Sequence, residues 1–299
     1  MALELWMTND VGQVRGRVAQ GFCPVECSVG GQSVVDGLMM DHHGELSGLE
    51  SVAIRALRDH AGARSEDPRF VGVGQADADM TFAVAALSGI LPDDPRVGPL
   101  AELIALVDTE PIGVDIASSE VGGILMVWNT LSGSPRDTAS ATAAVYLWRT
   151  LLCLPAQTLA LFEAVARQRL QARQEAAREA LEAHGRSLGL VLAIERSPVW
   201  GFDVWYGRRQ QGAFGSVEGW EHPVVVALSQ EPGRITVGCP NAAVARELFG
   251  PDGLRHVFEA LEPKGWGGRE AIGGSPRGVD VGADALYKAA ECLERFILR

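Results

Sequence analysis

The chain has 299 residues, of which 47% are hydrophobic and 21% are charged, and its formal net charge is -12. This length exceeds what one typical hydrophobic core serves, so we expect two domains. The acidic balance argues against a protein that grips long nucleic acid through a broad basic surface, because that affinity comes largely from neutralised phosphates. Small phosphorylated substrates remain compatible with it, since a metal site can supply local positive charge.

The cysteines and the N-terminus indicate in which cellular compartment we expect the protein. The five cysteines are an odd number scattered along the chain, which is not typical of a disulfide framework. Cys23 and Cys27 form a C-x3-C pair, but no second Cys/His pair nearby completes a tetrahedral zinc site. Neither a leader-like N-terminus nor an apolar run of membrane-spanning length is present, so we expect a cytoplasmic protein that does not interact with membranes.

The first candidate site follows an apolar run near the N-terminus. Leu3–Thr8 and Val34–Met40 are typical of strands, and the second leads directly into Asp41-His42-His43. In open α/β sheets, ligands bind at the carboxyl ends of strands. Carboxylate oxygens and imidazole nitrogens there are donors for Mn, Fe, Zn or Co. The pattern indicates a metal site, and a simple polar turn is the alternative.

The same order of elements returns further along the chain. A helix is expected over about Leu49–His60, and Phe70–Val73 is typical of another strand. An acidic loop with Asp77 and Asp79 follows this strand and precedes a helical pattern over Thr81–Leu87. Strand, acidic loop and helix therefore form a repeated theme.

A third carboxylate follows the apolar run Leu103–Val107, which could be a strand or the end of a helix. It belongs to Asp108, which could also be a helix cap or a turn former. If the three acidic turns meet at one edge of a sheet, Asp108 would join Asp41 and the Asp77/Asp79 pair in one site.

The second half of the chain begins with a long helix. Ala156–Ala183 contains no glycine or proline, and its later part is strongly polar, so we expect a connector between two lobes. Apolar β-like runs then return at Leu188–Ile194, Val199–Tyr206, Pro223–Leu228 and Arg234–Gly238, and a helix is expected over Gly282–Leu298. The predicted organisation is a domain over 1–154, a linker helix over 155–185 and a second domain over 186–299.

A glycine-dense segment, Gly265–Gly278, lies near the end of the second domain. Successive glycines let backbone N–H groups approach an anion, and Arg269 and Arg277 could make bidentate contacts to phosphate. A set of tight turns around a hairpin is the alternative.

These motifs together resemble the DHH phosphoesterase superfamily, which includes phosphodiesterases and manganese inorganic pyrophosphatases. The matching residues are Asp41-His42-His43, Asp77-Ala78-Asp79, Asp108, Gly267-Gly268-Arg269 and Gly273-Gly274-Ser275. The resemblance covers nearly the whole chain through a few short matches. It implies a two-lobed α/β protein: an N-terminal domain with a parallel sheet, a linker helix, a smaller DHH-associated α/β domain, and an active site in the cleft between the lobes.

The resemblance also implies roles for individual residues. It assigns divalent metal, expected to be manganese and two ions if the site is complete, to Asp41, His42, Asp77, Asp79 and Asp108. His43 becomes the candidate catalytic residue, as a ligand, a general acid or a substrate contact. The substrate would bind to Arg269, Gly273, Gly274, Ser275 and Arg277.

The chain departs from the family in motif order. In the family, a His followed by Asp-x-Asp comes first and Asp-His-His last, whereas here Asp41 precedes Asp77, and Val73 stands where the first His belongs. In one register, Asp77 and Asp79 form the first motif and Asp108 bridges two metals. In the other, Thr8-Asn9-Asp10 is a degenerate first motif, Asp36 the second, and Asp77 or Asp79 the last, which would leave one metal or none.

We therefore expect a metal-dependent phosphoesterase-like hydrolase that uses metal-activated water on a small phosphorylated substrate or short oligonucleotide. The alternative is a non-hydrolytic nucleotide- or anion-binding protein with the same two-lobed cleft. A third hypothesis, a relative of the alanyl-tRNA synthetase C-terminal domain, depends only on the glycine loop and is disfavoured by the acidic charge. A homodimer is a candidate assembly.

Overall fold

The fold of the chain is α/β, with a parallel sheet and a separate mixed sheet. The computed structural model describes residues 3–29, 32–35, 40–42, 46, 49–59, 68–109, 114, 116–133, 135–184, 186–187, 190–195, 205–209, 212–230, 233–261, 264–276 and 279–297. Its contacts divide the chain into two compact units, Met1–Arg169 and Leu170–Arg299. Among the described helices, none combines the length and the apolar character needed to cross a membrane.

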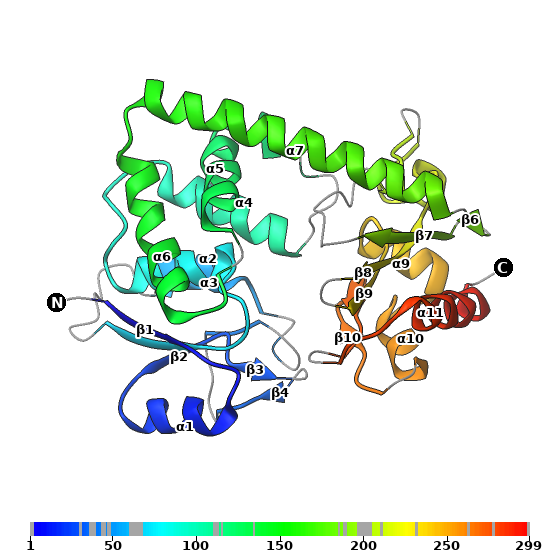
Figure 1. Cartoon of the computed structure of the whole chain (residues 1–299), viewed down its shortest axis with the longest axis horizontal. Coiled ribbons are helices and arrows are strands. Elements are labelled where there is room, and N and C mark those ends of the chain that lie inside the picture. The colour runs from blue at the N-terminus through cyan, green and yellow to red at the C-terminus, as the bar shows by residue number, and fades with distance from the viewer. Residues whose placement is uncertain are drawn as a thin grey trace. The chain divides into compact units, whose positions relative to one another are not determined.

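The first unit is organised around a parallel sheet in the order β1-β5-β2 (Figure 1). Its strands are β1 (Glu4–Met7), β5 (Arg69–Gly72) and β2 (Cys23–Val25). Met40 extends this arrangement through a single parallel bridge to Val25. The chain therefore leaves β2, β5 and Met40 at the same edge of the sheet, where their following residues can meet.

Helices cover both faces of this sheet. The described helices of this unit are α1 (Val11–Ala19), α2 (Val52–Asp59), α3 (Ala78–Leu87), α4 (Val97–Thr109), α5 (Gly122–Ser132) and α6 (Thr138–Cys153), of which α4 and α5 pack on other helices. Figure 1 shows α1 on one face and α3 and α6 on the other. Short elements complete the unit: the hairpin of β3 (Ser28–Val29) and β4 (Gln32–Ser33), and a 3-10 turn at Ile116–Ser118.

The alternation of buried and more exposed side chains along β1 explains its place in the core. Leu5 and Met7 are buried on one side, as expected for a strand with a period of two. Helix α3 is buried along almost its whole length, which fits its apolar sequence. Beside it, the indole of Trp148 stacks on Trp128 at 4.7 Å and donates to Oγ1 of Thr81. The sheet is thus supported on this side by a layer of buried helices.

The structure resolves one ambiguity and corrects one expectation. The apolar run Leu103–Val107 is helical within α4, so Asp108 lies in the last turn of a helix and follows no strand. A run of five apolar residues fits either a strand or a helix, and here α4 is half-buried on other helices.

Of the β-like run Val199–Tyr206, the described part is Trp205 and Tyr206, and both are helical. The predicted strand Val34–Met40 is described at its ends, and its middle, 36–39, lies outside the described residues.

The predicted long helix is present as α7 (Ala156–His184). The division between the two compact units falls inside it, after Arg169. No glycine or proline interrupts its 29 residues. The chain thus passes from one unit to the next as continuous helix.

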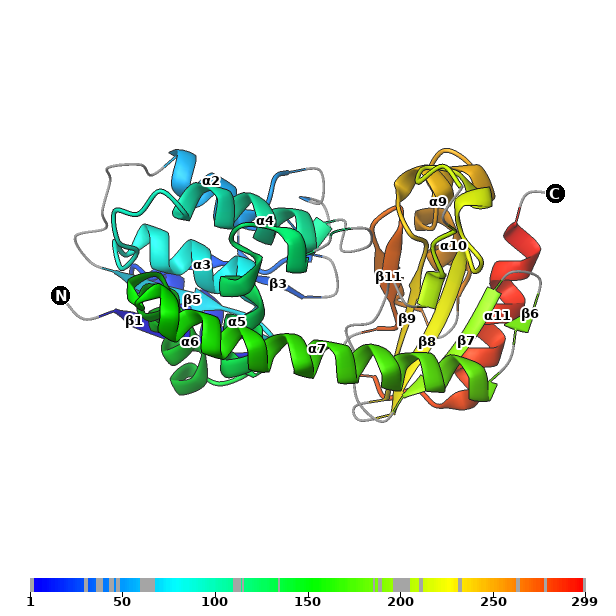
Figure 2. The same ribbon diagram turned by 90° about the horizontal axis from the view of Figure 1, so that it is seen from above.

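The second unit contains a mixed sheet in the order β10-β11-β9-β8-β7-β6. Figure 2 shows the strands from β11 to β6. The strands are β6 (Arg186–Ser187), β7 (Leu190–Glu195), β8 (Val224–Gln230), β9 (Gly233–Gly238), β10 (Gly267–Gly268) and β11 (Ile272–Gly274). β7 and β8 are parallel, and the other neighbours are antiparallel. The unit also contains a 3-10 turn at Val217–Gly219 and the helices α9 (Ala242–Phe249), α10 (Arg255–Ala260) and α11 (Ala283–Phe296).

The glycine-dense segment forms the β10–β11 hairpin, which was the alternative to an anion-binding loop. A Cβ on Gly273 would lie 2.4 Å from the Phe258 ring and 2.5 Å from the Gly267 carbonyl oxygen. One on Gly274 would lie 2.9 Å from the Ile235 carbonyl oxygen. The Ser275 hydroxyl accepts a hydrogen bond from the Ile235 N–H at 3.0 Å. Close packing of the sheet accounts for these residues, and their binding of substrate stays a prediction.

Replacing Gly273 by alanine should destabilise the second unit. The added methyl group overlaps both an aromatic ring and a carbonyl oxygen, and overpacking of this kind costs about 1 to 3 kcal/mol. Gly267→Ala is the matched control, because a Cβ there meets nothing within 4 Å. Urea denaturation followed by circular dichroism measures both variants, and equal losses of stability would contradict the packing role of Gly273.

Candidate metal centre

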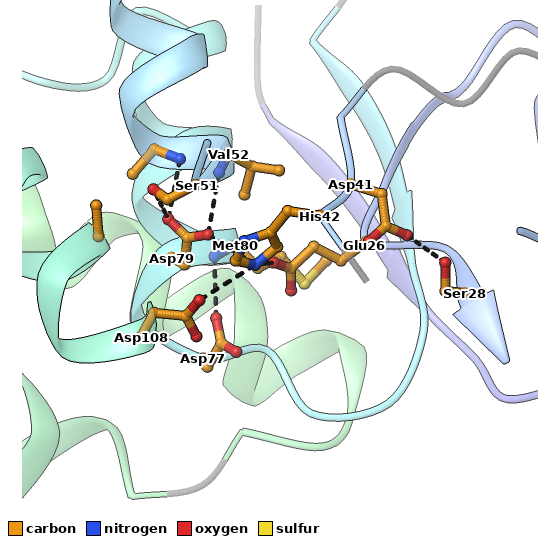
Figure 3. Close-up of polar contacts among 12 residues, drawn as sticks. Glu26, Ser28, Asp41, His42, Ser51, Val52, Asp77, Asp79, Met80 and Asp108 are labelled. Carbon is orange, nitrogen blue, oxygen red and sulfur yellow. Dashed lines mark hydrogen bonds and ion pairs between the residues drawn. The ribbon is translucent and has the colours of Figure 1, made fainter. Parts of the chain in front are cut away.

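Three side chains meet at the carboxyl edge of the parallel sheet (Figure 3). Glu26 directly follows β2, His42 follows Met40 by two residues, and Asp79 lies in the first turn of α3 after β5. All three are buried. Their ligand atoms lie within 4.8 Å of one another, so this group could hold a metal ion.

The imidazole of His42 is the centre of the group. Its Nε2 lies 3.3 Å from Oε1 of Glu26, 3.2 Å from Oδ2 of Asp79, and 3.3 Å from Oδ2 of Asp108. One N–H group cannot point at three carboxylate oxygens at once. The arrangement is therefore poorly explained by hydrogen bonding to a neutral histidine.

A cation between these atoms explains the spacing better. Two ligands that each bind a metal at about 2.1 Å lie roughly 3.0 to 3.4 Å apart in octahedral or tetrahedral geometry. The separations around Nε2 of His42 fall within this range. A divalent ion would also compensate the charge of the buried carboxylates. The donor set, one nitrogen and several oxygens, fits such an ion.

The carboxylate of Asp79 is held in place by the start of α2. Its Oδ1 accepts from the Ser51 hydroxyl at 2.6 Å and from the Ala53 N–H at 3.0 Å, and its Oδ2 accepts from the Val52 N–H at 3.0 Å. The carboxylate thereby satisfies two N–H groups at the start of α2 that have no partner inside the helix. Burial raises the pKa of Asp79 to about 6, with a further contribution from Asp77, even though these hydrogen bonds lower it.

Glu26 reaches the centre through an uncommon backbone conformation. Its φ is 51°, in the left-handed region, and its N–H donates to the Met40 carbonyl at 2.8 Å. Burial raises the pKa of Glu26 well above its usual range, and the surrounding carboxylates, Asp77 foremost, raise it further. The cost of ionising this group without a cation is therefore high.

Asp41 and Asp77 lie beside the centre, and each makes a defined local contact. Oδ2 of Asp41 accepts from the Ser28 hydroxyl at 2.7 Å, and the residue is fully buried. Oδ1 of Asp77 accepts from the Met80 N–H at 3.0 Å and caps α3. Their ligation of metal stays a prediction.

Other predicted site residues differ in where they lie. His43, Asp36 and Arg277 lie outside the described residues. Val73, which stands where the family motif has histidine, packs in an apolar core cluster with Val14 and Phe22. Asp108 reaches His42 from α4, and its side chain is 26% exposed.

Glu26 is the site residue that sequence reasoning missed. It lies between Cys23 and Cys27, a pair considered only for zinc. The thiol of Cys27 donates to the Val71 carbonyl at 3.2 Å, and burial raises its pKa to about 12. A carboxylate after an apolar triplet was the available signal, although β2 is only three residues long.

No family model matches the chain, and no curated protein matches it in sequence. The candidate site therefore depends on the geometry of these residues.

The metal-free chain should lose stability as pH rises. The folded-state pKa values of Glu26 and Asp79 lie above their usual values of 4.5 and 3.8. From about pH 4 upward, the carboxyl groups of Glu26 and Asp79 lose their protons more readily in the unfolded chain than in the folded chain. The free energy of unfolding therefore falls as pH rises. For Asp79 this fall continues through about pH 6, and for Glu26 it continues to higher pH.

Glu26→Gln should remove the part of this fall that Glu26 causes, so its free energy of unfolding should decrease less between pH 5 and pH 7 than that of the wild-type chain. Urea denaturation in the presence of a chelator measures it at both pH values. Glu102→Gln, on the exposed face of α4, is the control and should behave as the wild-type chain does. An unchanged pH dependence in Glu26→Gln would show that this carboxyl group titrates normally.

Proposed function

We propose that the chain is a metal-dependent phosphoesterase-like hydrolase acting on a small phosphorylated substrate or a short oligonucleotide. The observation that supports this most is the convergence of Glu26, Asp79 and Asp108 on Nε2 of His42 at 3.2 to 3.3 Å. Such a site at the carboxyl edge of a parallel sheet is where α/β enzymes bind their ligands.

Manganese is the metal we propose. Imidazole suits Zn, Cu, Fe and Ni, whereas carboxylates suit Mg, Ca and Mn, and a mixed set rich in oxygen favours manganese among them. The buried thiol of Cys27 is engaged with a backbone carbonyl, so a soft sulfur ligand is not offered by this residue. One ion held by Glu26, His42 and Asp79 agrees with the described ligand group.

Each residue of the site would contribute differently to catalysis. A bound divalent ion would lower the pKa of a water molecule and stabilise the negative charge that develops on phosphorus. The buried carboxylates of Glu26 and Asp79 would fix the position of the ion. Asp108, whose carboxylate lies beside the proposed ion and is partly exposed, would accept a proton from the attacking water.

Two features support a small phosphorylated substrate. The net charge of -12 disfavours long nucleic acid, because 38 aspartates and glutamates outnumber the 26 lysines and arginines that could neutralise successive phosphates. The Asp41-His42-His43, Asp77-Ala78-Asp79 and Asp108 motifs resemble those of DHH phosphoesterases.

The second candidate function is nucleotide or anion binding without hydrolysis. It is favoured by Val73, whose apolar side chain lies in the core where the family motif has a histidine ligand. A site that gathers one set of ligands holds one ion, and the two-ion clamp on the attacking and leaving oxygens would then be absent.

Metal analysis of the purified chain tests the proposal. We expect about one equivalent of Mn²⁺ to bind tightly and to support hydrolysis of bis(p-nitrophenyl) phosphate, a generic phosphodiester. Glu26→Gln and Asp79→Asn should each weaken Mn²⁺ binding by more than about 100-fold, because each removes a negative ligand. Isothermal titration calorimetry measures the affinity and absorbance measures the hydrolysis.

Glu102→Gln again serves as the control, and it should retain wild-type binding and hydrolysis. Tight Mn²⁺ binding without hydrolysis of this or a dinucleotide substrate would favour the non-hydrolytic candidate. A wild-type chain that binds no Mn²⁺, Fe²⁺ or Zn²⁺ would reject the hydrolase, and nucleotide affinity retained by that chain would favour the non-hydrolytic candidate.

A further inference from the structure

Helix α2 hydrogen-bonds to two residues at the candidate metal centre: to the side chain of Asp79 and to the backbone of Asp41. Its first turn holds the carboxylate of Asp79, as described above. Its second turn reaches the segment that carries His42, since Nη2 of Arg55 donates to the Asp41 carbonyl oxygen at 2.6 Å. The helix therefore supports both the side chain of Asp79 and the backbone segment that carries His42.

Ser51 is the side chain that joins the start of α2 to Asp79. Its side chain is buried, and its hydroxyl donates to Oδ1 of Asp79 at 2.6 Å. The same oxygen lies 3.5 Å from the Ile54 N–H, in the position of a helix cap. A carboxylate that accepts this hydroxyl together with two backbone N–H groups has its oxygens fixed in direction.

Arg55 follows Ser51 by four residues and so lies on the same face of α2. Its guanidinium group is buried, with Nε donating to the Glu50 carbonyl oxygen at 3.0 Å while Nη2 holds that of Asp41. The planar fork spans two backbone segments, a geometry that an ammonium group cannot reproduce. The carbonyl it holds belongs to the residue directly before His42.

We propose that Ser51 and Arg55 are positioning residues that set the distance between Asp79 and His42, so that metal affinity depends on both although neither is among the candidate ligands. This inference depends on the proposed metal centre. Residues that hydrogen-bond to ligands orient them, and their loss typically costs about 10- to 100-fold in metal affinity. Misplacement of a ligand by about 0.5 Å is enough to have such an effect.

Mn²⁺ titration of four variants of the full chain tests the inference. Ser51→Ala and Arg55→Met should each weaken Mn²⁺ binding by about 10- to 100-fold. Ser51→Thr keeps the hydroxyl and should bind close to wild type. Arg58→Met is the matched control, because Arg58 lies on the exposed side of α2 and pairs with Glu50. It should leave Mn²⁺ affinity unchanged.

Electron paramagnetic resonance of the bound Mn²⁺ separates positioning from a general loss of stability. We expect Ser51→Ala and Arg55→Met to change the zero-field splitting of the ion at saturating Mn²⁺, whereas Arg58→Met and Ser51→Thr keep the wild-type spectrum. If Arg55→Met does not fold, Arg55→Lys replaces it, and wild-type affinity in that variant would overturn the role of the guanidinium group.

The two proposals fail in different ways. Wild-type affinity and spectrum in Ser51→Ala and Arg55→Met, alongside lost binding in Glu26→Gln, would overturn the positioning role and leave the metal centre intact. Absence of Mn²⁺ binding in the wild-type chain would overturn both.

Discussion

A cluster of buried carboxyl groups is the constraint on which the first unit depends. Glu26 and Asp79 are almost wholly inaccessible to solvent, and Asp41, Asp77 and Asp108 surround them. Water cannot screen such a cluster, so the fold must compensate it locally. It does so in part through the N–H groups at the start of α2 and through the Ser51 and Ser28 hydroxyls. The remaining charge is the physical reason to expect a cation at His42.

The order of the sheet turns distant parts of the sequence into one site. Glu26, His42 and Asp79 are separated by 16 and 37 residues, yet each follows a segment paired in parallel at the same edge. Asp108 joins them from the last turn of α4. A parallel arrangement makes this convergence possible, because all of its strands end on the same side.

Much of the fold could be predicted from periodicity. The alternation in β1 and the uninterrupted helical composition of α7 are strong local patterns, and the structure confirms both elements. Leu103–Val107 was ambiguous because a short apolar run suits a strand and a helix equally, and packing among helices decides between them. Trp205 and Tyr206 are helical although aromatic residues favour strands, so tertiary packing outweighs propensity there.

The site could be predicted in part. His42, Asp79 and Asp108 were candidates from motif resemblance and from the turns they occupy, and the structure brings them together. Glu26 gave no comparable signal, because β2 is short, contains Pro24, and turns the glutamate inward through a left-handed backbone. For the glycines of the β10–β11 hairpin, the sequence left an anion-binding loop and tight turns around a hairpin as alternatives. Their close backbone contacts appear only once β11 lies on β9 and Gly273 on Phe258.

The left-handed conformation of Glu26 also has a consequence for the way this chain could vary. Glycine would adopt φ of 51° without the penalty of about 1 kcal/mol or more that a side chain with a Cβ carries. A glycine there would also remove a buried carboxyl group that is costly to ionise without a cation. On stability alone, glutamate is thus among the poorer choices at position 26, and a screen that selects only for heat resistance in a chelating buffer should drive it out. Stability favours glycine at this position, whereas ion binding favours glutamate.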